Sequence, residues 1–159
     1  TRSFHVTGVQ TCALPIFAAA ELAIVFGLIT LITGPLWGRK AWGVWWVWDA
    51  RLTSTLVMWL LYWSFILLRR FGGPGSEALS AGVGLFGMAL VPFVYWSVNV
   101  WRTLHPNTSV VPRLPASMGL PLWWDVAAFT CLYIALFALR TRLERLRFQV
   151  DGALADAED

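Results

Sequence analysis

Four long apolar blocks alternate with short polar segments along this chain. They cover residues 17–36, 52–68, 78–100 and 120–139. Within them the apolar side chains do not follow the 3.6- or 2.0-residue period of an element with one face in water. A helix rises 1.5 Å per residue, so each block is long enough, or nearly so, to cross about 30 Å of hydrocarbon. The pattern predicts four transmembrane helices.

Composition favours the same structure over a large soluble helical domain. The chain has 159 residues, of which 58% are hydrophobic and 13% charged. Soluble domains carry about 25% charged residues. We therefore expect an all-α integral membrane protein.

The distribution of arginine predicts the orientation of these helices. Arginines cluster at 69–70, after the second block, and at 140–147, after the fourth. With four spans these two ends lie on one side of the membrane, and the positive-inside rule makes that side cytoplasmic. Both termini are then cytoplasmic. The segment before the second block and the loop after the third face the opposite side, the periplasm if the membrane is a bacterial inner membrane.

The two ends of the chain differ in character from its middle. Residues 1–16 contain VTGVQTCALPI, which resembles the translated sequence of a DNA sequencing-library adapter, so we expect a non-native segment there. Residues 149–159 are small and acidic, a composition typical of a disordered tail, here cytoplasmic. The membrane domain is expected to cover residues 17–148.

Tryptophan is concentrated between the first two blocks, in WGRKAWGVWWVWDARLTS, residues 37–54. The five indoles of this segment are Trp37, Trp42, Trp45, Trp46 and Trp48. Each ring fully removed from water contributes about 4–6 kcal/mol, so something apolar must cover them. An aromatic belt at the membrane interface accounts for scattered tryptophans. Five rings within twelve residues exceed a belt and favour a platform for a planar aromatic ligand.

The same segment predicts a short helix on the membrane surface, over residues 42–52. At 100° per residue, one face of that helix is an indole platform with a carboxylate at its edge. This face comprises Trp42, Trp45, Trp46 and Asp49. Arg51 points away from it. Three partners remain open for Asp49: an indole N–H, a backbone donor or an arginine.

One histidine, His105, follows the third block in NVWRTLHPNTSVVPRLP. If the helix of that block continues outward, Trp101 and His105 share a face, and Pro106 makes His105 the last residue before a turn. Taken alone, His105 fits an ordinary interfacial histidine better than a haem-iron ligand. The tryptophan segment on the same side of the membrane reverses that preference.

Positive charges also lie on the periplasmic side, against the positive-inside rule. They are Arg39, Lys40, Arg51, Arg102 and Arg113. A buried anion beside lipid needs a paired cation, and an arginine can hold a carboxylate through two parallel hydrogen bonds. We expect these cations to pair with the acidic groups of an anionic ligand, with Arg51, Arg102 and Arg113 foremost and the other two behind them.

The tryptophan segment closely resembles the WWD signature of the haem-handling proteins of cytochrome c maturation. The stretches ARLTS and NVWRTLHPNTS resemble the CcmC family of haem exporter C subunits in particular, and the resemblance runs from about residue 17 to 148. It implies a six-helix protein of the bacterial inner membrane that holds haem at its periplasmic face. It further implies that this haem is presented to the chaperone CcmE, alongside the CcmA and CcmB transporter subunits and the small CcmD.

The resemblance also implies a haem site. The cargo is haem b, bound non-covalently by the WWD segment and two axial histidines, of which His105 matches the second. The first histidine and two N-terminal helices belong to a part of the family that this sequence lacks. The implied contacts to haem are Trp37, Trp42, Trp45, Trp46, Trp48, Asp49, Arg51, Trp101, Arg102 and Arg113. The implied role is delivery within an ABC-transporter-associated system rather than enzymatic catalysis, with lipid and no nucleic acid as further partners.

Three other functions remain open. A WWD protein of the CcmF or CcsA type attaches haem to apocytochrome as a lyase, but such chains are much longer and match ARLTS less well. A small lipid or ion transporter with an aromatic belt needs ionisable groups along a path inside the bundle, and only Glu21 and Asp125 come near one. The third is a structural subunit without a ligand.

Overall fold

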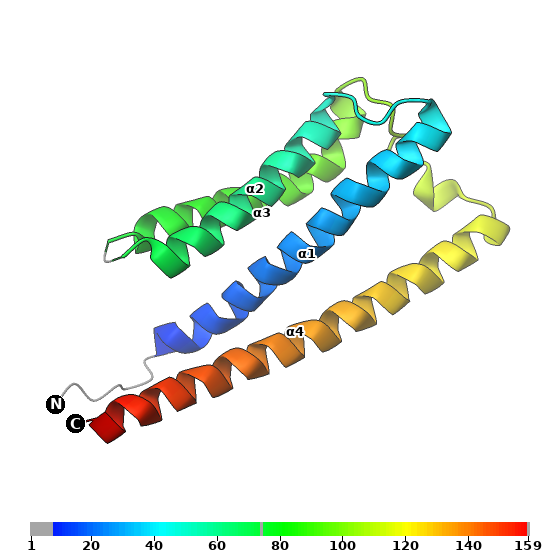
Figure 1. Ribbon diagram of the computed structural model, residues 1–159. Coiled ribbons are helices and arrows are strands. Elements are labelled where there is room, and N and C mark those ends of the chain that lie inside the picture. Colours follow the sequence, from blue (N-terminus) through cyan, green and yellow to red (C-terminus); the bar gives the residue numbers. More distant parts are fainter. Residues whose placement is uncertain (1–7, 74, 159) are drawn as a thin grey trace. The chain divides into compact units, whose positions relative to one another are not determined.

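The computed structural model describes residues 8–73 and 75–158. Four α-helices follow one another along this part of the chain (Figure 1): α1 (Gly8–Trp42), α2 (Ala50–Phe71), α3 (Glu77–Val100) and α4 (Ala116–Glu158). A short 3₁₀ helix, η1 (Val111–Arg113), precedes α4. The described residues contain no strand. The predicted all-α fold is confirmed.

Each helix includes a segment that is long and apolar enough to cross a membrane. These segments are Leu14–Trp42, Ala50–Phe71, Glu77–Val100 and Ala116–Leu154. The 22 residues of α2 rise about 33 Å, which matches the hydrocarbon thickness of a bilayer. Most large apolar side chains on the helices are exposed, an arrangement that is unfavourable in water and suits lipid. The four predicted spans are confirmed, and the chain is a multi-pass membrane protein.

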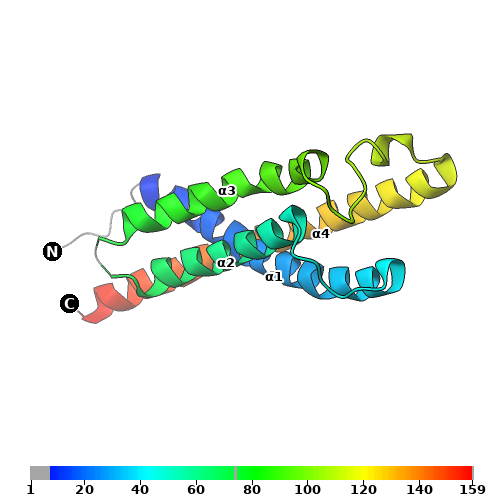
Figure 2. The same ribbon diagram turned by 90° about the horizontal axis from the view of Figure 1, so that it is seen from above.

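Residues 23–122 form one compact unit, in which α2 and α3 lie side by side along their length (Figures 1 and 2). Gly84 of α3 permits this approach. A Cβ at Gly84 would lie 3.3 Å from two ring atoms of Phe65, which is a tight contact, whereas one at Gly87 would make an ordinary contact with the ring of Tyr62 at 3.6 Å. Small residues stabilise helix pairs in lipid because they let backbones and side chains pack closely.

The same unit holds the contact between α1 and α2. The indole N–H of Trp59 on α2 donates a 2.9 Å hydrogen bond to the backbone oxygen of Ile24 on α1. Gly27 makes room for this ring, because a Cβ there would lie only 2.7 Å from Trp59 Cδ1. One hydrogen bond between the helices and one close approach at a glycine therefore hold this part of α1 against α2.

The other unit comprises, of the described residues, 8–22 from α1 and 123–158 from α4. Its main polar contact is an ion pair between the two helices. The Arg140 guanidinium donates to both carboxylate oxygens of Glu21 and lies 2.7 Å from the carboxylate of Glu144. These contacts pair charges that would be costly to leave alone in an apolar surrounding.

The predicted surface helix over residues 42–52 is wrong. Residues 43–49, here called the tryptophan loop, are non-helical, and α2 begins only after them. Gly43 takes a φ of +78°, a left-handed conformation that glycine adopts without strain and that ends α1. Its N–H still bonds to the last turn of α1. The 100° spacing that grouped the tryptophans with Asp49 therefore does not apply.

The predicted disordered tail over residues 149–159 is also wrong in its described part. α4 continues without a break to Glu158, and Asp159 lies outside the described residues. The segment is rich in alanine, the strongest helix former. Extending an existing helix adds a hydrogen bond for each residue ordered, without the cost of a new nucleus.

The predicted non-native segment, residues 1–16, lies partly outside the described residues. Residues 1–7 are not described, and residues 8–16 form the first turns of α1. Helix formation does not depend on the origin of a sequence. The boundaries of the membrane domain at 17–148 therefore stay a prediction.

Candidate functional site

The tryptophan loop ends on a helix cap. Asp49 has extended backbone angles (φ −90°, ψ 168°), and its Oδ1 accepts a 2.8 Å hydrogen bond from the N–H of Leu52. Aspartate is favoured at this position because it satisfies an N–H that lacks a partner within the helix, and because its charge complements the helix dipole. Of the partners that the sequence allowed for Asp49, the backbone donor is the one that its Oδ1 binds.

The loop after α3, residues 101–115, is held by its own polar contacts. The Asn99 side-chain amide donates to Thr108 Oγ1 at 2.9 Å, and the Thr108 N–H donates to Asn99 Oδ1 at 3.3 Å. Thr103 Oγ1 accepts a 2.8 Å hydrogen bond from the N–H of His105. His105 therefore has a defined position although it lies outside any helix.

Trp101 and His105 do not share a helical face, contrary to the prediction. α3 ends at Val100, and Trp101 is its C-cap with an extended backbone (φ −108°, ψ 150°). Pro106 disfavours helical angles at the residue before it, so the chain does not re-enter a helix at His105. The Trp101 ring lies instead near Phe93, with ring centroids 5.7 Å apart.

His105 contacts the last residue of α1 and the last residue of the tryptophan loop. Its imidazole lies edge to face with the indole of Trp42, with ring centroids 4.9 Å apart and planes at 74°. Its Nδ1 is 3.6 Å from Asp49 Oδ2. The side chain of Asp49 is 5% exposed and that of His105 is 20% exposed. Two loops that are distant in sequence thus form one site at one end of α2 and α3, as the alternation of spans predicted.

The surroundings of His105 favour its neutral form. Burial lowers the pKa of His105 below its ordinary value of 6.5, and the charge of Arg51 lowers it further, whereas Asp49 acts in the opposite direction. The neutral imidazole therefore predominates at neutral pH. That form has a nitrogen lone pair available for a metal ion, which the imidazolium lacks.

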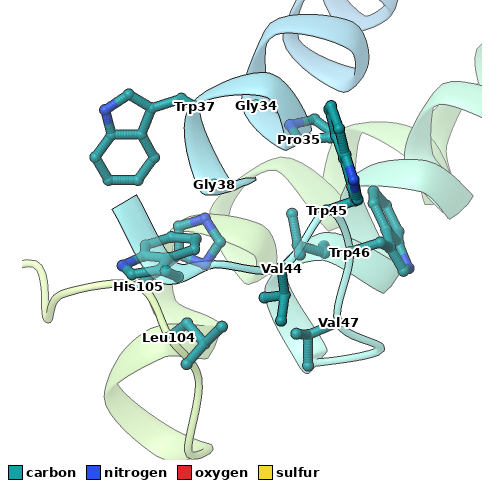
Figure 3. Close-up of a pocket in the computed structure, with 12 residues that line it drawn as sticks. Gly34, Pro35, Trp37, Gly38, Val44, Trp45, Trp46, Val47, Leu104 and His105 are labelled. Carbon is teal, nitrogen blue, oxygen red and sulfur yellow. The ribbon is translucent and has the colours of Figure 1, made fainter. Parts of the chain in front are cut away.

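A small cavity lies beside this contact (Figure 3). Its volume is about 60 Å³, well below the roughly 300–1,000 Å³ of pockets that enclose a drug-sized ligand. Five of the predicted site residues line it: Trp37, Trp42, Trp45, Trp46 and His105. In the view of Figure 3, Trp45 and Trp46 lie across the cavity from Trp37 and His105.

Three indole rings of the tryptophan segment are largely exposed. Trp37 is 59% exposed, Trp45 57% and Trp48 74%. Edge-to-face contacts support two of them, Trp37 against Trp42 at 4.8 Å and Trp48 against Trp46 at 5.6 Å between ring centroids. These rings are therefore accessible to a ligand that is too large for the cavity.

The predicted basic residues differ in their relation to the site. Arg51, in the first turn of α2, is partly buried, and its charge acts on the histidine. Arg102 and Arg113 are exposed and do not line the cavity. Arg39 and Lys40 are exposed in the last turn of α1. The structure brings Arg51 near His105, although it does not line the cavity, and leaves the other four exposed, with the Arg39 guanidinium donating a hydrogen bond to the carbonyl of Gly43.

Sequence reasoning missed the small and aliphatic residues of the cavity wall. They are Gly34, Pro35, Gly38, Val44, Val47, Leu52 and Leu104. Gly38 shows why such residues matter, because a Cβ there would lie 3.4 Å from the Trp42 ring. The sequence indicates these wall residues only through their position, since all but Leu104 lie within or next to the tryptophan segment.

The sequence of this chain is similar to those of known proteins. The sequence profile described as "Heme exporter protein C" matches residues 4–155. Proteins named "Heme exporter protein C" are similar to the chain. That of Haemophilus influenzae is 34% identical over 145 residues, which is 87% of this chain and 59% of the relative. That of Escherichia coli K12 is 38% identical over 136 residues, 81% and 54% of the two chains.

A third relative of the same name, from Bradyrhizobium diazoefficiens, is 40% identical over 139 residues, which is 84% of this chain and 53% of the relative. The similarity thus extends over most of this chain in each comparison. The chain itself spans only 53–59% of the length of these three relatives.

Proposed function

This chain belongs to the heme exporter protein C family, and on that premise we propose that it binds haem and passes it on during cytochrome c maturation. The observation that carries the proposal is the contact between His105 and Trp42 beside exposed indole rings. Haem is a flat apolar macrocycle with an iron atom that accepts axial imidazole ligands. An imidazole next to aromatic surface matches both features.

The proposed mode of binding is partly open. A cavity of about 60 Å³ does not enclose a macrocycle, so we propose that haem b lies against Trp37, Trp45 and Trp48, with Trp42 and Trp46 behind them, and takes His105 as an iron ligand. A second axial ligand comes from outside the described residues. Incomplete burial suits a delivery protein, because a cargo held half-exposed can leave without unfolding its carrier.

The proposed role is delivery rather than catalysis, since holding and releasing haem requires no covalent bond to be made or broken. We propose that the recipient is the chaperone CcmE and that the chain works with CcmA, CcmB and CcmD, an ABC-transporter-associated assembly in the lipid bilayer without nucleic acid. The support is membership in the family together with four membrane-spanning helices.

Haem titration tests the proposal. We expect the purified chain to bind haem, and Trp45→Ala to weaken binding on the order of tenfold without changing the ligand-dependent absorption bands. Tenfold is about 1.4 kcal/mol, which corresponds to about 55 Å² less apolar surface buried against the haem at 25 cal/mol per Å². Trp123→Ala is the control, because this ring is exposed on α4 outside the site. Equal losses from both substitutions would contradict the proposed platform.

The orientation proposed for the site is the periplasmic side of the bacterial inner membrane. Reporter fusions after Arg70 and after Arg113 are expected to report opposite sides, with the second in the periplasm, because α3 crosses the bilayer between them. Alkaline phosphatase and green fluorescent protein provide complementary signals. The same side for both fusions would exclude this topology.

The basic residues are proposed to pair with the haem propionates, with Arg51, Arg102 and Arg113 foremost and Arg39 and Lys40 behind. A carboxylate held without a cation at the edge of lipid is unfavourable. Alanine at all five positions should therefore weaken binding of haem more than binding of its dimethyl ester, which lacks the two charges. If the substitutions weaken both ligands equally, the charge pairing is wrong.

A further inference from the structure

Asp49 and His105 carry two buried polar atoms that other contacts leave unused. The cap of α2 occupies Asp49 Oδ1, which accepts from Leu52 N–H. Asp49 Oδ2 and His105 Nδ1 each have no hydrogen-bond partner among the described residues, and they face each other at 3.6 Å. This separation exceeds the usual range of a hydrogen bond by about 0.4 Å. Buried polar atoms in proteins are nearly always paired.

Both side chains are held so that a small change closes this gap. The cap orients the Asp49 carboxylate, with one oxygen on the helix and the other toward the histidine. The edge-to-face contact with Trp42 and the hydrogen bond from the His105 N–H to Thr103 limit the movement of the imidazole. Hydrogen bonds at ligand sites are often long in the unliganded protein and shorten when the ligand binds.

We propose that Asp49 is the positioning residue of His105: its Oδ2 accepts a hydrogen bond from Nδ1–H, which leaves Nε2 as the nitrogen with the lone pair for iron. The inference rests on the proposed haem binding and specifies how the ligand is prepared. Neutral imidazole has one protonated and one free nitrogen, and the hydrogen bond made by one determines which is free to bind metal. A carboxylate in this place also makes the imidazole a stronger donor to the metal.

Two substitutions separate this role from the helix cap. Asn and Ser both serve as N-caps, so Asp49→Asn and Asp49→Ser keep the start of α2. In Asp49→Asn the amide oxygen stays on the Leu52 N–H, and the amide nitrogen then faces His105 Nδ1 as a donor. That arrangement requires a lone pair on Nδ1 and moves the proton to Nε2. Asp49→Ser removes the partner altogether. Asp125→Asn, an exposed carboxylate on α4, is the matched control.

The first measurement uses the haem-free chain in lipid nanodiscs, with ¹⁵N-labelled histidine and leucine, at a pH where the imidazole ring is neutral. The chain has two histidines, so the spectrum of His105→Ala assigns the signals. We expect Nδ1–H in the original chain and in Asp125→Asn, Nε2–H in Asp49→Asn, and no fixed tautomer in Asp49→Ser. The amide signal of Leu52 reports whether the cap is kept. A tautomer that is the same in all four proteins, with the cap intact, overturns the proposal.

The second measurement is haem affinity and the reduction potential of the bound haem. Substitution of the residue that hydrogen-bonds a metal-binding histidine typically lowers metal affinity by 10–100-fold. We therefore expect Asp49→Asn to lower haem affinity by roughly that factor. We also expect its bound haem to be more easily reduced. Unchanged affinity and potential in Asp49→Asn overturn the role toward iron. If the position of the imidazole proton changes with the residue at 49 but none of the proteins binds haem, the proposed function is wrong, whereas the hydrogen bond between Asp49 and His105 is supported.

Discussion

Replacing His105 with alanine is expected to abolish axial ligation of haem by this chain and to weaken binding by roughly 100-fold or more. The reason is that the substitution removes the iron-binding nitrogen, and even an outer partner of such a ligand is worth 10–100-fold in affinity. His105 is the only histidine among residues 8–159, so no other imidazole of the described chain can replace it. Absorption spectroscopy during a haem titration measures both the affinity and the ligation.

Added imidazole distinguishes loss of the ligand from loss of the site. It should sharpen the spectrum of the original chain by filling the second axial position. It should also restore part of the ligation in His105→Ala, because the cavity beside the missing ring remains. His5→Ala is the control, since His5 is the other histidine of the chain. Retention of the original spectrum and affinity in His105→Ala would refute the assignment of the iron ligand.

Replacing Gly27 with leucine is expected to separate α1 from α2 and to disrupt the site at a distance. The first atom of the new side chain would lie 2.7 Å from Trp59 Cδ1, and Trp59 is anchored to Ile24 by its indole N–H. Overpacking of this kind costs about 1–3 kcal/mol. Because α1 carries Trp37 and Trp42, we expect a lower unfolding midpoint and weaker haem binding together.

The chain supplies a control and a rescue for this experiment. A Cβ added at Gly82 on α3 would meet no atom of the described residues within 4 Å, so Gly82→Leu should leave the unfolding midpoint nearly unchanged. Adding Trp59→Ala to Gly27→Leu removes the clashing ring and should recover part of the stability. Equal midpoints for Gly27→Leu and Gly82→Leu would show that α1 and α2 do not pack through this contact.

The transmembrane helices follow from the sequence because their cause is local. An uninterrupted apolar run of sufficient length is stable across lipid as a helix wherever its neighbours lie, since a helix satisfies its own backbone hydrogen bonds. The family was also readable from the sequence, because WGRKAWGVWWVWDARLTS is distinctive, and the match over residues 4–155 confirms that resemblance. The tail was misjudged because composition carries no information on whether a preceding helix propagates.

The tryptophan loop shows where periodicity fails. Spacing at 100° per residue assumes an unbroken helix, and the conformation of Gly43 breaks it. The aspartate before ARLTS is a recognisable start signal for α2, and the structure shows it acting as one through Leu52. The local sequence thus indicated the correct start of α2. The spacing of the tryptophans instead predicted one face of a helix over residues 42–52, and that helix does not form.

The sequence by itself determined that this chain has four membrane-spanning helices and that its tryptophan loop and its histidine lie at the same end. Only the tertiary structure decided which atoms meet there. The edge-to-face contact between Trp42 and His105 and the approach of Asp49 Oδ2 to His105 Nδ1 join segments that are distant in the chain, and the cavity lies between these segments. Such contacts depend on how the helices pack, as where Gly27 fits against Trp59 and Gly84 against Phe65. Packing depends on two facing surfaces together, so the sequence of one segment does not determine it.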